Sequence, residues 1–379
     1  MNRTSFIALS ICSVASLQAA DLQLIDTHAN PQTRNLYQNL YEVGQEHVLF
    51  GHQNTTAYGH DWVGDEGTSD VKAVTGSYPA VYGWDIMDLD RAGDATYGYN
   101  RKDLKRWVTE AYERGGVSTF SWHMPNPVTG ESFYDTTPAV STILPGGENH
   151  EGFKHDLDDV AEFFHSVEPV PIIFRPFHEH NGDWFWWCKG STSEEDYIAL
   201  WRFTIDYLRH EKGVHNVIYA FSPDRSRLGM EDAKDGYFWG YPGDDYVDII
   251  GLDNYWDVGH PANEKSADDS RALFVESLEL IVDIADAKHK VPALTETGND
   301  TLKVDNWYTD ILLAGLDANE KTRRIAYVQV WRNANRELEG KEHFYAPYPG
   351  QSQADDFIEF MNSDLILFEN ELPDLYHQP

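Results

Sequence analysis

The sequence predicts a single-domain α/β fold in which eight parallel strands close into a (β/α)8 TIM barrel. Short apolar runs that end in polar or charged residues recur eight times, and segments with helical periodicity lie between them. Strands that alternate with helices form parallel sheets. No Gly-x-Gly-x-x-Gly follows an early strand, as it would in an open dinucleotide-binding sheet. Eight such units in 379 residues therefore favour a closed barrel over an open, doubly wound sheet.

The eight apolar runs are the candidate barrel strands. In chain order they span residues 48–52, 80–85, 117–123, 171–179, 217–224, 247–255, 291–296 and 325–331. In a barrel of this kind, function lies at the C-terminal ends of the strands. The last residues of each run are therefore the first candidates for an active site.

Four segments between the runs have the apolar spacing of amphipathic helices. They cover residues 102–114, 192–213, 270–288 and 304–316. In the second, Thr192 and Glu195 have the spacing of a capping box, which predicts a helix that begins there.

The N-terminus has the three zones of a secretory signal peptide: Arg3, an apolar stretch over residues 6–17, and small residues up to Ala20. Cleavage after Ala20 would leave one continuous catalytic domain over residues 21–379, because no linker-like stretch or repeat interrupts that part. Secretion, or export to the periplasm, is therefore expected. The mature chain would keep one cysteine, Cys188, and so no intrachain disulfide.

Acidic residues dominate the charge of the chain. With 29 Lys and Arg against 63 Asp and Glu, the formal charge is −34 at pH 7, and no basic run is present. Nucleic acid and anionic membranes are therefore not expected as partners. A monomer is expected. Aromatic residues make up 13% of the chain. Their flat faces suit a neutral, hydroxyl-rich ligand such as a sugar, although core packing also accounts for many of them.

Titratable and aromatic side chains gather at the predicted strand ends. They are His52, Asp85, His123, His178, Glu179, Asp224, Tyr255, Glu296 and Trp331. Such a concentration favours an active site over a purely structural ring. Asp224 and Asp253 are expected to serve as loop caps, whereas Asp85 fits a cap and a ligand contact equally well.

Two carboxylates, Glu179 and Glu296, end the fourth and seventh apolar runs. In a closed barrel they would point into the same mouth from opposite sides. Glycoside cleavage needs such a pair, because one carboxylic acid protonates the leaving oxygen while a carboxylate attacks or stabilises the oxocarbenium-like centre. The pair therefore predicts a glycosidase.

The most specific segment spans residues 175–187 and reads Arg-Pro-Phe-His-Glu-His-Asn-Gly-Asp-Trp-Phe-Trp-Trp. It resembles the acid/base region of glycoside hydrolase family 26, the β-mannanases of a large retaining (β/α)8 clan. Residues 293–298, Ala-Leu-Thr-Glu-Thr-Gly, are similar to the nucleophile strand of that family. His178 stands where much of the wider clan has Asn, which is itself a mark of family 26. The resemblance covers nearly the whole mature chain.

The resemblance implies a retaining β-1,4-mannanase that hydrolyses mannan, galactomannan or manno-oligosaccharides by double displacement. Glu179 would be the general acid/base and Glu296 the nucleophile that forms a covalent glycosyl-enzyme. Endo action and the release of mannobiose from a chain end both stay open.

The resemblance also implies roles for the neighbouring side chains. The substrate-binding candidates are His123, His178, Trp184, Tyr255, Trp331, Arg175 and Asp85. Within this set, the two histidines would bind sugar hydroxyls and Trp331 would form the floor under the reacting ring. Trp184 would support the leaving-group side. The charge of Arg175 would keep Glu296 ionised, and the aromatic surroundings of Glu179 would raise its pKa.

No cofactor or metal is predicted. The sequence His178-Glu179-His180 suggests metal ligands, but neighbouring strand residues face opposite ways and no His-Glu-x-x-His is present. Two alternatives to a mannanase remain. One is a related retaining β-glycanase on mixed-linkage glucan or xylan, and the other is a noncatalytic glycan-binding barrel.

Overall fold

The computed structural model of the chain describes residues 22–89, 97–229 and 233–377. The predicted signal peptide, residues 1–20, lies outside these ranges. Eight parallel strands form the centre of the molecule. They are β1 (Val48–Gln53), β4 (Val81–Asp85), β5 (Val117–Ser121), β6 (Ile172–Arg175), β7 (Val217–Phe221), β8 (Ile249–Asn254), β9 (Val291–Thr297) and β10 (Tyr327–Val330).

The strands pair in chain order, and β10 pairs back with β1, from Leu49 opposite Tyr327 to His52 opposite Val330. This closure confirms the predicted single-domain TIM barrel. Within the described ranges, three short strands lie outside the ring. Strand β11 (Ile366–Leu367) pairs with the start of β1, while β2 (Tyr58–Gly59) and β3 (Trp62–Val63) form a small hairpin after β1.

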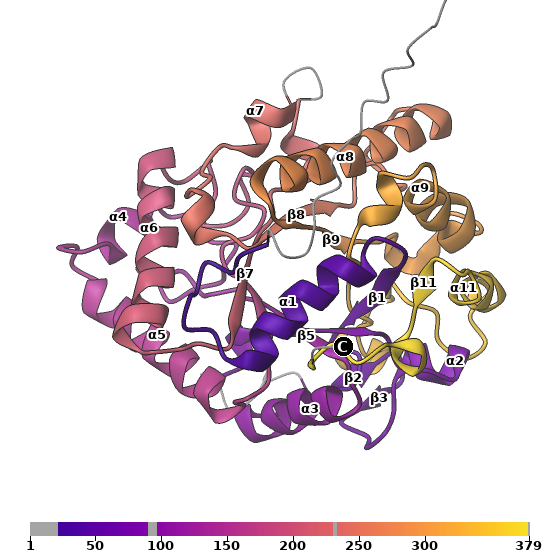
Figure 1. Ribbon diagram of the computed structural model, residues 1–379, viewed down its shortest axis with the longest axis horizontal. Coiled ribbons are helices and arrows are strands. Elements are labelled where there is room, and N and C mark those ends of the chain that lie inside the picture. The colour runs from indigo at the N-terminus through magenta and orange to yellow at the C-terminus, as the bar shows by residue number, and fades with distance from the viewer. Residues whose placement is uncertain (1–21, 90–96, 230–232, 378–379) are drawn as a thin grey trace, which may run out of the picture.

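Helices surround the barrel, as Figure 1 shows for α3, α5, α6 and α8. The α-helices of the described ranges are α1 (Pro31–Val43), α2 (Asp70–Thr75), α3 (Arg101–Glu113), α4 (Val140–Ile143), α5 (His150–Ser166), α6 (Glu194–Asp206), α7 (Ala233–Tyr237), α8 (Ala267–Lys288), α9 (Ala314–Leu316), α10 (Arg336–Glu339) and α11 (Ala354–Met361). None of the helices in this part of the chain has the length and apolar character needed to cross a bilayer.

The four predicted helices are present, with two corrections. The N-cap of α6 is Ser193, whose hydroxyl accepts the Asp196 N–H at 3.1 Å, so the capping box predicted from Thr192 is wrong. The predicted helix 304–316 begins only at Trp307, as π-helical turns that lead into α9. Asn306 adopts a left-handed conformation with φ 51°, which prevents an earlier start.

The fourth predicted strand extends too far. Strand β6 ends at Arg175, and the chain then turns, with Phe177 and Glu179 in the left-handed region at φ 49° and 53°. The Glu179 N–H donates to the Ser222 carbonyl at 2.8 Å, which ties this turn to the end of β7. His178 and Glu179 are therefore turn residues. The expectation that they face opposite ways, as neighbouring strand residues do, does not apply to them.

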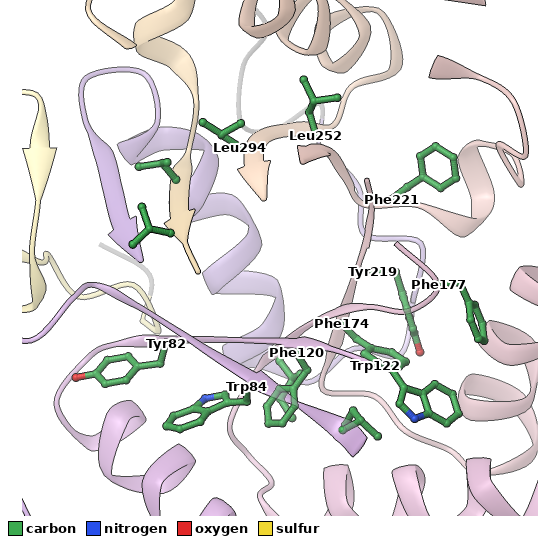
Figure 2. Close-up of a cluster of buried hydrophobic side chains, with 14 of the residues drawn as sticks. Tyr82, Trp84, Phe120, Trp122, Phe174, Phe177, Tyr219, Phe221, Leu252 and Leu294 are labelled. Carbon is green, nitrogen blue, oxygen red and sulfur yellow. The ribbon is translucent and has the colours of Figure 1, made fainter. Parts of the chain in front are cut away.

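Bulky side chains on the outer face of the barrel pack under the helices. Trp84, Phe120, Phe174 and Phe221 are all fully buried in this layer, part of which Figure 2 shows. Their burial provides the main driving force that holds the helices against the strands. The outer layer explains a large share of the aromatic content noted in the sequence.

Helix α1 closes the N-terminal end of the barrel. Its buried residues Leu36 and Leu40 belong to one apolar cluster with inward-facing strand residues such as Val81 and Ile218. In Figure 1, α1 lies across the strands. The opposite, C-terminal end is therefore the open one.

Side chains fill the barrel interior. Gln329 of β10 donates to Gln53 of the neighbouring strand β1 at 2.7 Å, directly beside Gly83. A Cβ on Gly83 would lie 2.0 Å from the Gln53 side-chain oxygen, so a larger residue there would displace the Gln53–Gln329 pair. The interior is thus a packed core with a polar layer below the open end.

Candidate active site

A cavity of about 1030 Å³ opens at the C-terminal end of the barrel. Its walls include all but one of the predicted site residues, namely Asp85, His123, His178, Glu179, Trp184, Tyr255, Glu296 and Trp331. The exception, Arg175, lies beneath the cavity floor and is 2% exposed. Loops that are more than 200 residues apart in sequence therefore meet in one cleft.

Glu296 is held in one orientation near the end of β9. One carboxylate oxygen accepts a hydrogen bond from Arg175, and the other accepts one from the Tyr255 hydroxyl at 2.9 Å. The side chain is buried but still reaches the cavity. A carboxylate with both oxygens fixed in this way is preorganised to act at a defined point in the cleft.

Arg175 joins Glu296 to a second buried carboxylate. Its Nη1 donates to Asp253 at 2.8 Å, and Asp253 also accepts from the Thr295 hydroxyl at 2.7 Å. Burial raises the pKa of Asp253 well above its usual range, while the charge of Arg175 opposes that rise. Asp253, expected to be a loop cap, thus supports the site by holding Arg175.

Replacing Arg175 by Ala is expected to destabilise the fold by about 3–5 kcal/mol, because Asp253 and Glu296 would remain buried without their counter-charge. Urea unfolding followed by fluorescence would measure the change. Arg227→Ala serves as the control, since Arg227 forms an exposed ion pair with Asp183 and should contribute only about 0–1 kcal/mol. Equal losses for the two variants would contradict the prediction.

Glu179 is half-buried, and its environment favours the protonated form. Burial raises its pKa well above the usual range, and the negative charges of Asp224, Asp253 and Glu296 raise it further. The Trp184 indole N–H donates to its Oε2 at 2.8 Å and partly opposes this shift. Glu179 and Glu296 therefore have different environments, one suited to a proton donor and the other to an anion held by Arg175.

Two substitutions should move the alkaline limb of the kcat/KM–pH profile in opposite directions, because kcat/KM reports the first step and the free enzyme. Activity falls as pH rises through the pKa of Glu179, because its proton is then lost. Trp184→Phe removes a hydrogen bond that favours the ionised form, so the limb should shift to higher pH. Asp224→Asn removes a repelling charge, so the limb should shift to lower pH. Initial rates between pH 4 and 10 would measure both, and shifts in the same direction would contradict this assignment.

Asp85 orients His123. Its oxygens accept from the Met87 N–H at 2.9 Å, the Ser121 hydroxyl at 3.0 Å and the His123 N–H at 3.1 Å, and one also contacts the His123 Nδ1. Burial opposes ionisation, but His123 and these hydrogen bonds together lower the pKa of Asp85. The structure thus places Asp85 against His123, and both side chains line the cavity.

His178 lies beside the two carboxylates. Its Nε2 is 3.9 Å from Glu296, and its ring is 4.7 Å from that of His123. Burial lowers the pKa of His178 well below its usual range, and the charge of Arg175 adds to this effect. The imidazole is therefore neutral near pH 7 and can donate or accept one hydrogen bond with a sugar hydroxyl.

Several cleft residues escaped sequence reasoning because they lie outside the barrel strands. They include Tyr58, Tyr99, Phe133, Tyr134, Trp256, Asp300, Lys303, Arg332, His343 and Tyr345. Trp256 and Arg332 have a sequence signal, since they directly follow the strand-end residues Tyr255 and Trp331. Arg332 is bound at both Nη atoms by Glu339.

One group among the described residues has the spacing of metal ligands. His178, Asp253 and Glu296 each offer an atom within 4.8 Å of the others. The guanidinium of Arg175 already binds both carboxylates. A cation at this point would have to compete with that buried positive charge.

Comparison with known proteins identifies the family. Residues 25–334 match the model for glycosyl hydrolase family 26. A β-mannanase structure of this family from Bacteroides ovatus is 38% identical and superposes with a TM-score of 0.82, over 92% of this chain and 98% of that one. A modular endo-β-1,4-mannanase from Cellulomonas fimi is 36% identical, with a TM-score of 0.84, over 94% of this chain and 80% of that one.

A mannan endo-1,4-β-mannosidase from Bifidobacterium adolescentis is 34% identical over 92% of this chain. The chain spans 36% of the length of that enzyme and 52% of a relative from Caldalkalibacillus mannanilyticus. The similarity thus concerns the barrel and the residues gathered at its open end. By sequence, by barrel closure and by the match over residues 25–334, the chain belongs to glycosyl hydrolase family 26.

Proposed function

We propose that the protein is an endo-β-1,4-mannanase that cleaves mannan with retention of anomeric configuration. The observation that carries the proposal is the pairing of Glu179 and Glu296 in one cleft, with a raised pKa for the first and a guanidinium bound to the second. The names of the relatives support the substrate, since those from Bifidobacterium adolescentis and Cellulomonas fimi are β-1,4-mannanases.

In the first step, the Glu296 carboxylate attacks the anomeric carbon as the bond to the leaving oxygen breaks. Glu179 gives its proton to that oxygen, so the leaving sugar departs as a neutral alcohol. Tyr255 and Arg175 hold Glu296 in line through hydrogen bonds to its two oxygens. The product of this step is a covalent glycosyl-enzyme.

In the second step, ionised Glu179 removes a proton from water. The water oxygen attacks the anomeric carbon on the face of the sugar from which the leaving group departed, and the bond to Glu296 breaks. Two inversions give net retention, and Glu179 is protonated again. His178 and His123 bind hydroxyls of the reacting sugar, while Trp331 forms the floor under the ring.

A substrate panel tests the proposal. The purified chain should release reducing sugar from mannan and glucomannan and should act at least ten-fold more slowly on mixed-linkage glucan and xylan. Proton NMR of the first product should show the β-anomer before mutarotation, and mannan viscosity should fall early, as internal cleavage requires. Hydrolysis of glucan or xylan alone would favour the related-glycanase alternative. Binding of mannan without any hydrolysis would favour the noncatalytic barrel.

We also propose that the protein acts outside the cytoplasm, after cleavage behind Ala20. The support is the zoned N-terminal sequence, residues 1–20. N-terminal sequencing of the protein recovered from the periplasm or medium of an expressing bacterium should begin at Asp21. Recovery of the uncleaved chain from the cytoplasm alone would contradict this proposal.

A further inference from the structure

Tyr134 is unusual among the large hydrophobic side chains that the structure describes. It is 61% exposed, whereas the other exposed ones, Val128, Leu338 and Ile358, are between 37% and 52% exposed. It also lines the catalytic cavity, which those three do not. An aromatic ring held open to water inside a cleft is typical of a surface that a ligand covers.

The loop that carries Tyr134 is fixed by its own hydrogen bonds. Asn126 is fully buried, and its amide donates to the carbonyls of Asp135 at 2.8 Å and Thr137 at 2.9 Å. Its side-chain oxygen accepts the Val128 N–H at 2.9 Å. These bonds fix the segment on both sides of Tyr134. The ring is therefore presented in a defined position, and its exposure is a feature of the fold.

A series of stacked rings connects Tyr134 to the acid/base side of the cleft. Its ring lies 5.5 Å from that of Phe185, with 28° between the planes, and Phe185 stacks at 4.4 Å on buried Trp187. The residue before Phe185 is Trp184, which donates to Glu179.

We propose that Tyr134 is a stacking platform for a sugar unit on the leaving-group side of the bond that is cleaved. The proposal rests on the proposed function. It adds a substrate contact that is not part of the two catalytic steps. A pyranose presents a C–H face that suits an aromatic ring, and covering Tyr134 would remove its apolar surface from water. The gain would depend on the ring and not on the phenolic hydroxyl.

Two substrates that differ only in the leaving group test the platform. Mannotetraose places sugar units on both sides of the bond, whereas 4-nitrophenyl β-mannobioside has an aryl group in place of the leaving sugar. Tyr134→Ala should lower kcat/KM for mannotetraose about ten-fold and for the aryl mannobioside less than about two-fold. Tyr134→Phe should restore the mannotetraose value. Ile358→Ala, an exposed apolar truncation on α11, is the matched control and should change neither value.

Equal losses on the two substrates, or no loss on mannotetraose, would overturn the platform while leaving the proposed function intact. A loss shared by Tyr134→Phe would also overturn it, because it would assign the contact to the hydroxyl. A wild-type chain that hydrolyses neither substrate would instead refute the proposed function. The platform would then be judged by calorimetry with mannohexaose, where Tyr134→Ala should weaken binding about ten-fold and unchanged affinity would overturn it.

Discussion

Replacing Glu296 by Ala should abolish mannan hydrolysis, with a loss in kcat on the order of 10⁴-fold or more. The reason is that neither of the neighbouring carboxylates, Asp253 and Glu179, is free to attack the anomeric carbon. Asp253 is bound by Arg175 and Thr295, and Glu179 is set up as a proton donor. Reducing-sugar release measured with a large excess of enzyme would detect the residual rate.

Added azide or formate provides the second readout for Glu296→Ala. A small anion can occupy the space of the lost carboxylate and attack the anomeric carbon, so part of the activity should return and the mannosyl azide should have the inverted, α configuration. Glu276→Ala, on the exposed face of α8, is the charge-matched control and should keep full activity. If Glu296→Ala retained more than about a tenth of wild-type turnover, Glu296 would not be the nucleophile.

Replacing Glu179 by Ala should lower kcat on mannan by about 10²–10⁴-fold, the usual contribution of a positioned general acid. The loss should depend on the leaving group. A sugar alkoxide needs the proton from Glu179, whereas 2,4-dinitrophenolate leaves without one, so the first step on a dinitrophenyl mannobioside should be nearly unaffected. The initial burst of dinitrophenol, measured by stopped flow, would show this directly.

For Glu179→Ala, hydrolysis of the glycosyl-enzyme should become rate-limiting, because water is no longer activated by a general base. Azide should then accelerate turnover and give a mannosyl azide of retained, β configuration, opposite to that expected for the Glu296 variant. This difference assigns the two roles in one pair of experiments. Equal losses on mannan and on the dinitrophenyl substrate would show that Glu179 is not the proton donor.

Much of the fold could be predicted from local sequence. The eight apolar runs correspond to barrel strands β1 and β4 to β10, because each run must be buried on both faces of a covered parallel sheet. The helix beginning at Ser193 shows where local reasoning loses accuracy. Thr192 and Ser193 both fit an N-cap, and only the backbone conformation, with ψ 155° at Ser193, decides between them.

The turn after β6 could not be predicted in the same way. Residues 171–179 read as one continuous strand, but Phe177 and Glu179 adopt left-handed conformations that local propensity disfavours. The hydrogen bond from Glu179 to Ser222 and the packing of Phe177 in the core stabilise that turn. Both contacts come from tertiary structure, and the same turn brings Glu179 to the Trp184 indole.

By itself, the sequence determined the barrel, the two carboxylates and the family, because strand periodicity and the motif around Glu179 are local properties of the chain. Only the tertiary structure decided the electrostatic difference between the two carboxylates. The pKa of Glu179 depends on its burial and on the charges of Asp224, Asp253 and Glu296, which lie after β7, in β8 and in β9. The exposure of Tyr134 likewise depends on the position that its loop adopts in the folded molecule. The burial of a side chain and its distances to charged groups depend on contributions from the whole folded molecule. Spacing along the chain therefore cannot specify them.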